Sequence, residues 1–243
     1  MTERIPGANA PSWLVVGDRE ELVDALVRAA RPLASAGIES RGYWTIAIPG
    51  GSVVEQLLGP LVRAPLDWEH AHVFWCDERA VAPTDPQSNW GLAQGLLEST
   101  RRLGAQLHRM PADQTDLSKA AADYAAELES VAGHPPQLDI VLLGVGEDGH
   151  VASIFPDTRR RLTRDRWWSR CRLPKPPAQR MSLALDVLAR ARLTCVAAFG
   201  AGKADVVRRA MGPACDLPVG HVLRYAARPM LLADSAAARA AVA

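Results

Sequence analysis

The residues best suited to chemistry follow an apolar run at residues 138–143. The run leads into Gly144, Gly146, Asp148, Gly149 and His150. A run of isoleucine, valine and leucine is typical of a strand buried on both faces of a parallel sheet. The glycines allow a sharp turn and a close approach of the backbone to a ligand. Because an imidazole titrates near neutral pH, His150 is a candidate general base at a strand end, where α/β sheets bind ligands. A histidine that only satisfies a tight turn is the alternative, but it does not explain the surrounding carboxylates.

Three other apolar runs also end in polar residues. These are Gly50-Gly51-Ser52 after residues 43–48, Asp77-Glu78-Arg79 after residues 72–75, and Lys203 after residues 193–199. Backbone N–H groups and a hydroxyl at the start of a helix can cradle a phosphate. Lys175 and Arg180 add two cations on a segment stiffened by prolines. Each feature alone fits an ordinary turn or a solvated surface, but together they predict a site for a small anion such as a phosphate ester.

Strand-like and helix-like segments alternate along the chain. Strands are expected at residues 13–16, 43–48, 72–75, 138–143, 193–199 and 229–233. Helices are expected at residues 18–36, 53–61 and 89–98, from residue 116 or 118 onward, and from residue 203 to about residue 211. Asp18, Ser88 and either Asp116 or Ser118 are the expected N-caps. This rhythm predicts an α/β fold, a doubly wound, mostly parallel sheet with helices on both faces. The stretch 156–180, rich in proline and arginine, is expected to be a long irregular loop that covers the site.

Composition narrows the class of protein. The 243 residues fit one α/β domain over 1–243, and 28 Lys plus Arg against 27 Asp plus Glu leave a net charge of +1. Such a balance predicts no nucleic acid and no membrane as partner. The four cysteines are far apart, which favours reduced thiols in a cytoplasmic protein over a disulfide or metal framework. The sequence shows neither the pattern of a signal peptide nor an apolar run of roughly 20 residues, so we expect no membrane-spanning segment.

Four blocks of sequence, taken together, resemble a known family. They are Pro49-Gly50-Gly51-Ser52, residues 73–79 with Ser88-Asn89, residues 142–156, and Pro174-Lys175-Pro176-Pro177 through Arg180 with Gly202-Lys203-Ala204. The chain resembles the 6-phosphogluconolactonases, within the wider group of glucosamine-6-phosphate deaminases and ribose-5-phosphate isomerases. The resemblance spans about residues 45 to 205, and the third block is its most specific part.

The resemblance implies hydrolysis of a sugar phosphate lactone, 6-phosphoglucono-δ-lactone, without a metal or an organic cofactor. By this similarity His150 matches the general base, and Gly50, Gly51 and Ser52 match the phosphate loop. Arg79 matches a substrate-contacting arginine, and Arg180 and Lys203 match cations near the phosphate. Lys175, Asp77 and Gly149 are further expected substrate contacts. Asp148 or Asp77 is expected to orient the imidazole, and the sequence leaves open which of Asp77, Glu78 and Asp148 contacts it.

Two other functions are possible alternatives for this sequence. A glucosamine-6-phosphate deaminase is similar at the same strand ends, but it has a glutamate five residues after the histidine, where this chain has Phe155, and a tyrosine where this chain has Arg79. A sugar-phosphate sensor on this fold usually adds a helix-turn-helix, whereas the roughly 40 residues before the first long strand are expected to hold one helix and no such unit. Both comparisons favour the lactonase. The oligomeric state, monomer or homodimer, is left open.

Overall fold

A seven-stranded parallel sheet forms the centre of the protein. The computed structural model describes residues 13–156, 168–172, 177–212 and 215–241. Across the sheet the strands are β1 (Leu14–Val16), β10 (Pro229–Ala233), β9 (Leu193–Ala198), β6 (Ile140–Gly144), β2 (Trp44–Ile48), β3 (Ala71–Trp75) and β5 (Gln106–His108). Every pair in this sheet is parallel. The four central strands are almost wholly buried, because helices cover both faces, and this explains their mainly apolar sequences.

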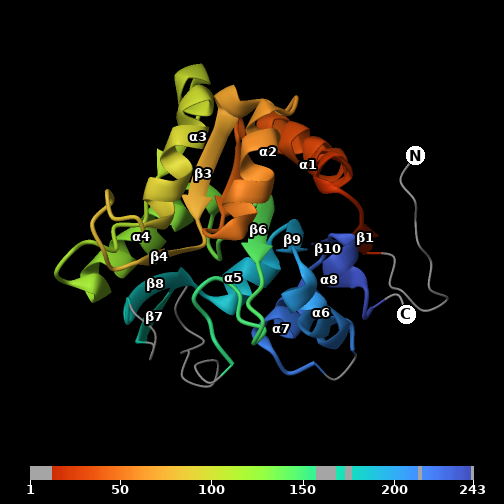
Figure 1. The fold of residues 1–243 in the computed structure, drawn as a ribbon. Coiled ribbons are helices and arrows are strands. Elements are labelled where there is room, and N and C mark those ends of the chain that lie inside the picture. The colour runs from red at the N-terminus through yellow and green to blue at the C-terminus, as the bar shows by residue number, and fades with distance from the viewer. Residues whose placement is uncertain (1–12, 157–167, 173–176, 213–214, 242–243) are drawn as a thin grey trace.

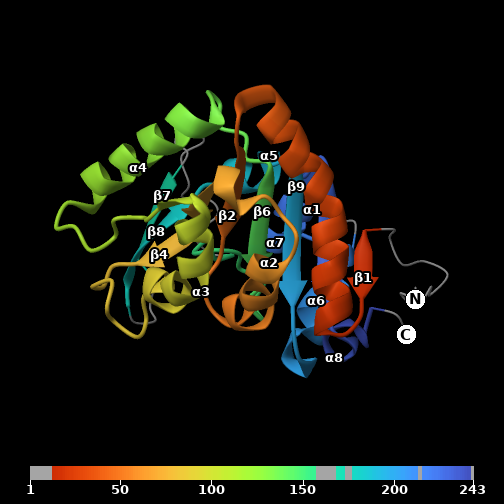
Figure 2. The ribbon, with the colours of Figure 1, turned by 90° about the horizontal axis from the view of Figure 1, so that it is seen from above.

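The helices lie in two layers (Figures 1 and 2). One face carries α1 (Arg19–Arg41), the π-helical turn η1 (Val54–Leu58) with α2 (Gly59–Arg63), and α3 (Asn89–Leu103). The other face carries α5 (Leu185–Arg190), α6 (Ala204–Met211) and α7 (Pro218–Tyr225). The remaining elements are α4 (Leu117–Ala132), the 3₁₀ turns η2 (Trp68–His70) and η4 (Ala201–Lys203), and α8 (Ser235–Ala238). The predicted doubly wound α/β fold is thereby confirmed.

The expected N-caps are present at three helices. Asp18 forms a capping box with Glu21, Ser88 accepts a hydrogen bond from the third residue of α3, and Asp116 caps α4. The predicted end of the first helix at residue 36 is wrong, because α1 continues to Arg41 and stops at Gly42, whose φ is 85°. Gly37 is a packing residue, since a Cβ there would lie 2.9 Å from the carbonyl oxygen of Tyr43.

A second, antiparallel sheet stands beside the carboxyl ends of the main sheet. It consists of β4 (Asp77–Arg79), β8 (Gln179–Leu183) and β7 (Trp168–Arg172) in that order. The prediction that residues 156–180 form an irregular loop is therefore wrong for β7 and for the start of β8. Strand β8 pairs with β4, about 100 residues away in the chain, and β7 pairs with β8. Local sequence patterns do not report a partner at such a distance.

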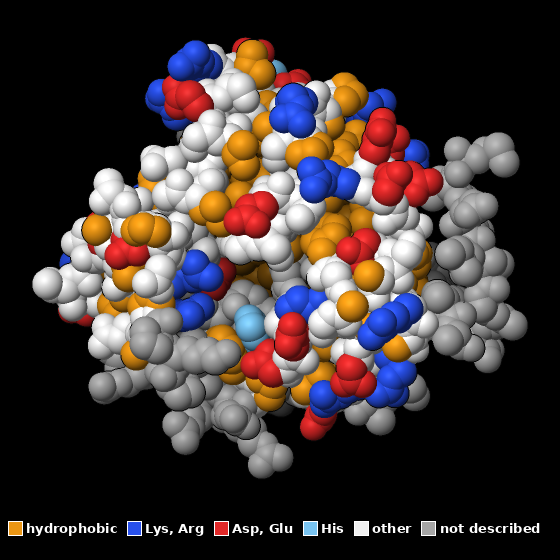
Figure 3. Space-filling model, in the orientation of Figure 1, with side chains coloured by type: hydrophobic (Ala, Val, Ile, Leu, Met, Phe, Trp, Pro, Cys, Tyr) orange, Lys and Arg blue, Asp and Glu red, His pale blue; other side chains and the backbone are white. Residues whose placement is uncertain are grey.

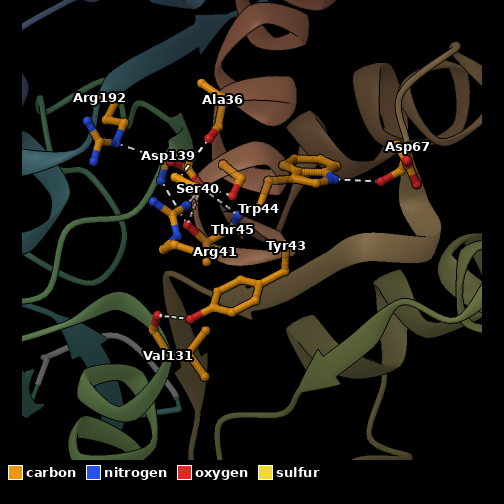
Figure 4. Close-up of polar contacts among 11 residues, drawn as sticks. Ala36, Ser40, Arg41, Tyr43, Trp44, Thr45, Asp67, Val131, Asp139 and Arg192 are labelled. Atoms are coloured by element: carbon orange, nitrogen blue, oxygen red, sulfur yellow. Dashed lines mark hydrogen bonds and ion pairs between the residues drawn. The ribbon is translucent and has the colours of Figure 1, made fainter.

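A buried carboxylate ties two central strands at the opposite end of the sheet (Figure 4). Asp139, 1% exposed and just before β6, accepts hydrogen bonds from Thr45 of β2 through N at 2.9 Å and Oγ1 at 3.0 Å. Arg41 Nη2 lies 2.6 Å and Arg192 Nε 3.2 Å from its two carboxylate oxygens. This cluster fixes the amino ends of β2 and β6, whose carboxyl ends carry the glycine-rich segments.

Among the described helices, none has the length and apolar character to cross a bilayer.

Candidate active site

A cleft of about 180 Å³ opens at the carboxyl ends of four strands. Its lining includes residues that follow β2, β3, β6 and β9, together with Arg180 of β8. The cleft includes the point between β2 and β6 where the chain changes direction across the sheet, since β3 and β5 extend one way and β9, β10 and β1 the other. Doubly wound sheets bind ligands at such a switch point. Among the predicted site residues, the lining contains Gly50, Gly51, Ser52, Asp77, Arg79, His150, Arg180 and Lys203.

His150 and Asp148 form a hydrogen-bonded pair at this cleft. Asp148 Oδ1 lies 2.6 Å from His150 Nδ1 and also accepts from the His150 backbone N–H at 3.2 Å. Partial burial raises the pKa of the Asp148 carboxyl, but the hydrogen bonds and charge of His150 outweigh it, so the pKa lies below its ordinary value. A carboxylate only accepts hydrogen bonds, so Nδ1 of the neutral ring carries the proton and Nε2 keeps its lone pair.

The other two carboxylates have different partners. Asp77 is buried beside the cleft and accepts hydrogen bonds from Ser153 Oγ at 2.5 Å and from Asn89 Nδ2 at 3.2 Å. Glu78 accepts from the backbone N–H groups of Arg79, Asn89 and Trp90, so it holds the start of α3. Burial raises the pKa of Glu78, against the opposing effect of these N–H donors. Of the three candidates, Asp148 is the one in contact with His150.

Glycines and an aromatic ring set the position of the imidazole. A Cβ at Gly146 would lie 2.0 Å from His150 Nδ1 and 2.5 Å from Asp148 Oδ1, so any side chain there would displace the pair. Gly149 does not line the cleft. Its φ of 86° places it in the left-handed region, and a Cβ there would meet Leu217 at 2.6 Å, so it shapes the turn. Phe155 stacks on the imidazole at 4.2 Å between ring centroids and an interplanar angle of 22°.

The rest of the cleft wall is cationic. Arg79 and Arg180 are directly paired across β4 and β8, and Lys203 ends the turn η4 after β9. Figure 3 shows Lys and Arg side chains on either side of a hollow in which a histidine side chain is exposed. Arg79 Nη1 donates to the carbonyl of Gln87, while its buried Nε has no partner among the described residues. Such a wall suits an anionic ligand.

The turn after β2 brings backbone to the cleft. Gly51 has a φ of 65°, and the helical segment 52–63 begins at Ser52. Gly50 lies against Asn89, since a Cβ there would sit 1.7 Å from Asn89 Oδ1. Glycine is thus required at both positions, one for conformation and one for space. The first N–H groups of a helix lack partners within it, and here they begin beside the cleft.

Several residues of the cleft wall were not among the predicted substrate contacts. Asn89, Gly146, Ala152, Val145 and Phe199 belong to the cleft wall. Asn89 was named in the sequence only beside the Ser88 cap, without a role in binding. Phe199 is the last residue of a predicted strand, and this place at a strand end is the signal that could have identified it. Lys175, a predicted substrate contact, lies outside the described residues.

Within the described ranges no group of three His, Cys, Asp or Glu side chains is arranged to hold a metal ion.

Comparison with known proteins places this geometry in a family. Residues 17–230 match the sequence model of the family described as glucosamine-6-phosphate isomerases/6-phosphogluconolactonase. The chain belongs to this family. It is 34% identical to a 6-phosphogluconolactonase of Streptomyces coelicolor over 250 residues, covering 95% of each chain. It is 32% identical to one of Mycobacterium leprae over 238 residues, covering 93% of this chain and 96% of the relative.

Solved structures of the family share the fold. The 6-phosphogluconolactonase of Leishmania guyanensis superposes with a TM-score of 0.73 at 26% identity, covering 93% of this chain and 97% of that one. The enzyme of Shewanella baltica gives a TM-score of 0.78 at 24% identity, covering 92% and 98%, and supports the fold alone. The resemblance predicted from the four sequence blocks is confirmed at the level of the family.

Proposed function

We propose that this chain hydrolyses 6-phospho-D-glucono-1,5-lactone to 6-phospho-D-gluconate, the second step of the oxidative pentose phosphate pathway, in the cytoplasm. The observation that carries the proposal is the His150–Asp148 pair facing a cleft wall with three cationic side chains. A lactonase for a phosphorylated sugar needs these two parts, a base for water and an anchor for phosphate. Relatives named for this activity align over more than nine-tenths of the chain.

In this proposal His150 acts as a general base. A lactone is an activated ester, so water attacks its carbonyl carbon without a covalent enzyme intermediate. As the C–O bond forms, Nε2 takes a proton from the water, and Asp148 stabilises the imidazolium through Nδ1. The tetrahedral intermediate then breaks the ring C–O bond, and the proton passes from His150 to the departing ring oxygen. General-base assistance of this kind contributes roughly 10²–10⁴-fold.

The phosphate anchor is formed by other residues of the cleft wall. Ser52, Arg180 and Lys203 hold the phosphate, with the N–H groups of Gly50 and Gly51 beside them. Arg79 and the glycine-rich turns supply donors for the negative charge that builds on the carbonyl oxygen. Holding the ring at its far end aligns the carbonyl with the base, and such positioning accounts for much of an enzyme's rate gain.

No cofactor enters this proposal. Water deprotonated by an imidazole suffices to open an activated ester, so neither a metal-bound hydroxide nor an organic cofactor is required. Hydrolysis should persist at the same rate after dialysis against EDTA. Loss of activity that a divalent ion restores would overturn this part of the proposal.

The direct test uses freshly made 6-phosphogluconolactone. The chain should accelerate 6-phosphogluconate formation far beyond the spontaneous rate, and His150→Ala should lower kcat by about 10²–10⁴-fold. His70→Ala is a matched control, because His70 also pairs through Nδ1 with an aspartate, Asp67, at 2.9 Å but lies outside the cleft. Binding of the lactone without turnover would favour a sensor instead. Near-normal turnover by His150→Ala would remove this residue from the mechanism.

The family also includes isomerases of glucosamine 6-phosphate. The ring of Phe155 stacks on His150, and by the sequence resemblance this is the position at which the deaminases have a glutamate. An apolar ring cannot assist ring opening of an amino sugar by proton transfer. Glucosamine 6-phosphate should therefore release no ammonia with this protein, and ammonia release at a rate comparable to lactone hydrolysis would reverse the assignment.

A further inference from the structure

The candidate site is assembled from two separate sheets. His150 lies on the turn after β6 of the seven-stranded sheet, whereas Arg79 and Arg180 lie on β4 and β8 of the three-stranded sheet. A lactone held by its phosphate reaches the base correctly only when the spacing between these parts is fixed. A tie between the turn after β6 and the smaller sheet is therefore required.

Ser153 is placed to make this tie. Its side chain is fully buried, and its hydroxyl donates to Asp77 Oδ2 of β4 at 2.5 Å. Its backbone N–H donates to Ser182 Oγ of β8 at 3.3 Å. Asp77 and Ser182 are themselves paired across β4 and β8, two positions from the pair Arg79–Arg180. One residue of the turn after β6 thus contacts both strands that carry the arginines.

The chain between Ser153 and His150 is short and constrained. Val151 forms bridges with both Val145 and Ile154, and the Gly146 N–H donates to the His150 carbonyl at 2.9 Å. Ala152 between them has a φ of 49°, a left-handed conformation that is costly for a residue with a side chain. A displacement of Ser153 is consequently transmitted to the imidazole three residues earlier.

We propose that Ser153 is a positioning residue that, through its hydrogen bond to Asp77, sets the distance between the base His150 and the phosphate-binding Arg180. The inference rests on the proposed function. It assigns Ser153 no contact with the substrate. Its hydroxyl matters only while the phosphate is anchored on the small sheet, because a lactone that is free at its far end can adjust to a displaced base.

The test is a double-mutant cycle in lactone hydrolysis with Ser153→Ala and Arg180→Met. In the wild-type background Ser153→Ala should lower kcat/KM by about 10- to 100-fold, the loss expected of a displacement near 1 Å. In the Arg180→Met background the same change should cost less than about threefold, since the anchor is already weakened. Ser153→Cys fills the same space with only a weak donor and should follow Ser153→Ala, which covers the case of a poorly folded alanine variant.

A buried hydroxyl elsewhere provides the control. Thr194 is fully buried at the start of β9, away from the cleft, and its Oγ1 donates to the Leu188 carbonyl at 2.9 Å. Thr194→Val should lower Tm without changing kcat/KM. Losses from Ser153→Ala and Ser153→Cys that are equal in both backgrounds would overturn the inference and leave Ser153 a structural residue. A wild-type rate no faster than spontaneous hydrolysis would instead refute the proposed function itself.

Discussion

Arg79 on β4 and Arg180 on β8 are direct cross-strand partners, so two guanidinium groups project from facing positions of one small sheet. Like charges in this arrangement are destabilising. Both line the cleft, and among the described residues no carboxylate forms an ion pair with Arg79. An anion bound near the two arginines offsets the repulsion between them, so the pair favours an anionic ligand.

The first prediction concerns anion binding by Arg180. Arg180→Met should raise KM for the phosphorylated lactone by about 10- to 100-fold. One charge-assisted hydrogen bond of roughly 1.5–3 kcal/mol accounts for that change. Inorganic phosphate should raise the Tm of the wild type and raise that of the variant much less. Arg28→Met, which changes an exposed arginine of α1, is the control. A drop in Tm with an unaltered KM would assign Arg180 to structure.

A second prediction uses the close approach of Gly146 to the pair His150–Asp148. Gly146→Ala places a methyl group where His150 Nδ1 and Asp148 Oδ1 now meet, so the imidazole must move. Because the cations are untouched, kcat should fall about 10²-fold while the affinity for 6-phosphogluconate stays within about threefold. Gly95→Ala is a suitable control, since a Cβ there meets nothing within 4 Å. Isothermal titration with the product and steady-state kinetics separate the two effects.

The sequence predicted the strand ends better than the contacts between them. Apolar runs and glycines place His150, Ser52 and Lys203 at carboxyl ends of parallel strands, and the fold then brings these ends together whatever the details of side-chain packing. The choice among Asp77, Glu78 and Asp148 as partner of His150 was not predictable. The choice depends on the turn made by Gly146 and Gly149 and on the hydrogen bond that Asp77 accepts from Ser153.

The small sheet is the main part of the fold that the sequence did not predict. Strand β4 has three residues, and its partner β8 comes about 100 residues later, so neither has a pattern long enough to be recognised alone. Arg180 was nevertheless predicted as a site residue, through the family resemblance and its place on a proline-rich segment. Its pairing with Arg79 became visible only with the tertiary structure.

A third prediction addresses the buried Asp139 at the other end of the sheet. Asp139→Ala leaves the Thr45 N–H without an acceptor and separates Arg41 and Arg192 from their shared carboxylate. The free energy of unfolding should fall by about 2–4 kcal/mol. Since the cluster lies at the amino ends of β2 and β6, kcat/KM per folded molecule should be unchanged below the melting transition. Urea denaturation and kinetics at 20 °C check both parts, and a large kcat/KM loss in fully folded Asp139→Ala would contradict the separation of the two ends.

The last prediction concerns the dependence of stability on pH. His72 Nδ1 lies 2.9 Å from His108 Nε2, and His108 Nδ1 lies 2.6 Å from Glu127 Oε1. Burial, and to a lesser degree the charge of His108, lower the pKa of His72 below its ordinary value. The unfolded chain therefore binds the proton more readily, so the free energy of unfolding must fall as pH drops below about 6.5.

His72→Gln removes this titration and should make the loss of stability between pH 7 and 5 shallower. His70 provides a control of opposite sign, because its hydrogen bond with Asp67 raises its pKa and stabilises the folded protein at low pH. His70→Gln should accordingly make the acid loss steeper. Groups that contact neither histidine are the same in all three proteins, so their contributions cancel in the comparison. Urea midpoints measured at pH 7.0, 6.0 and 5.0 decide the matter: equal slopes for the wild type and His72→Gln would show that protonation of His72 is not disfavoured in the folded state.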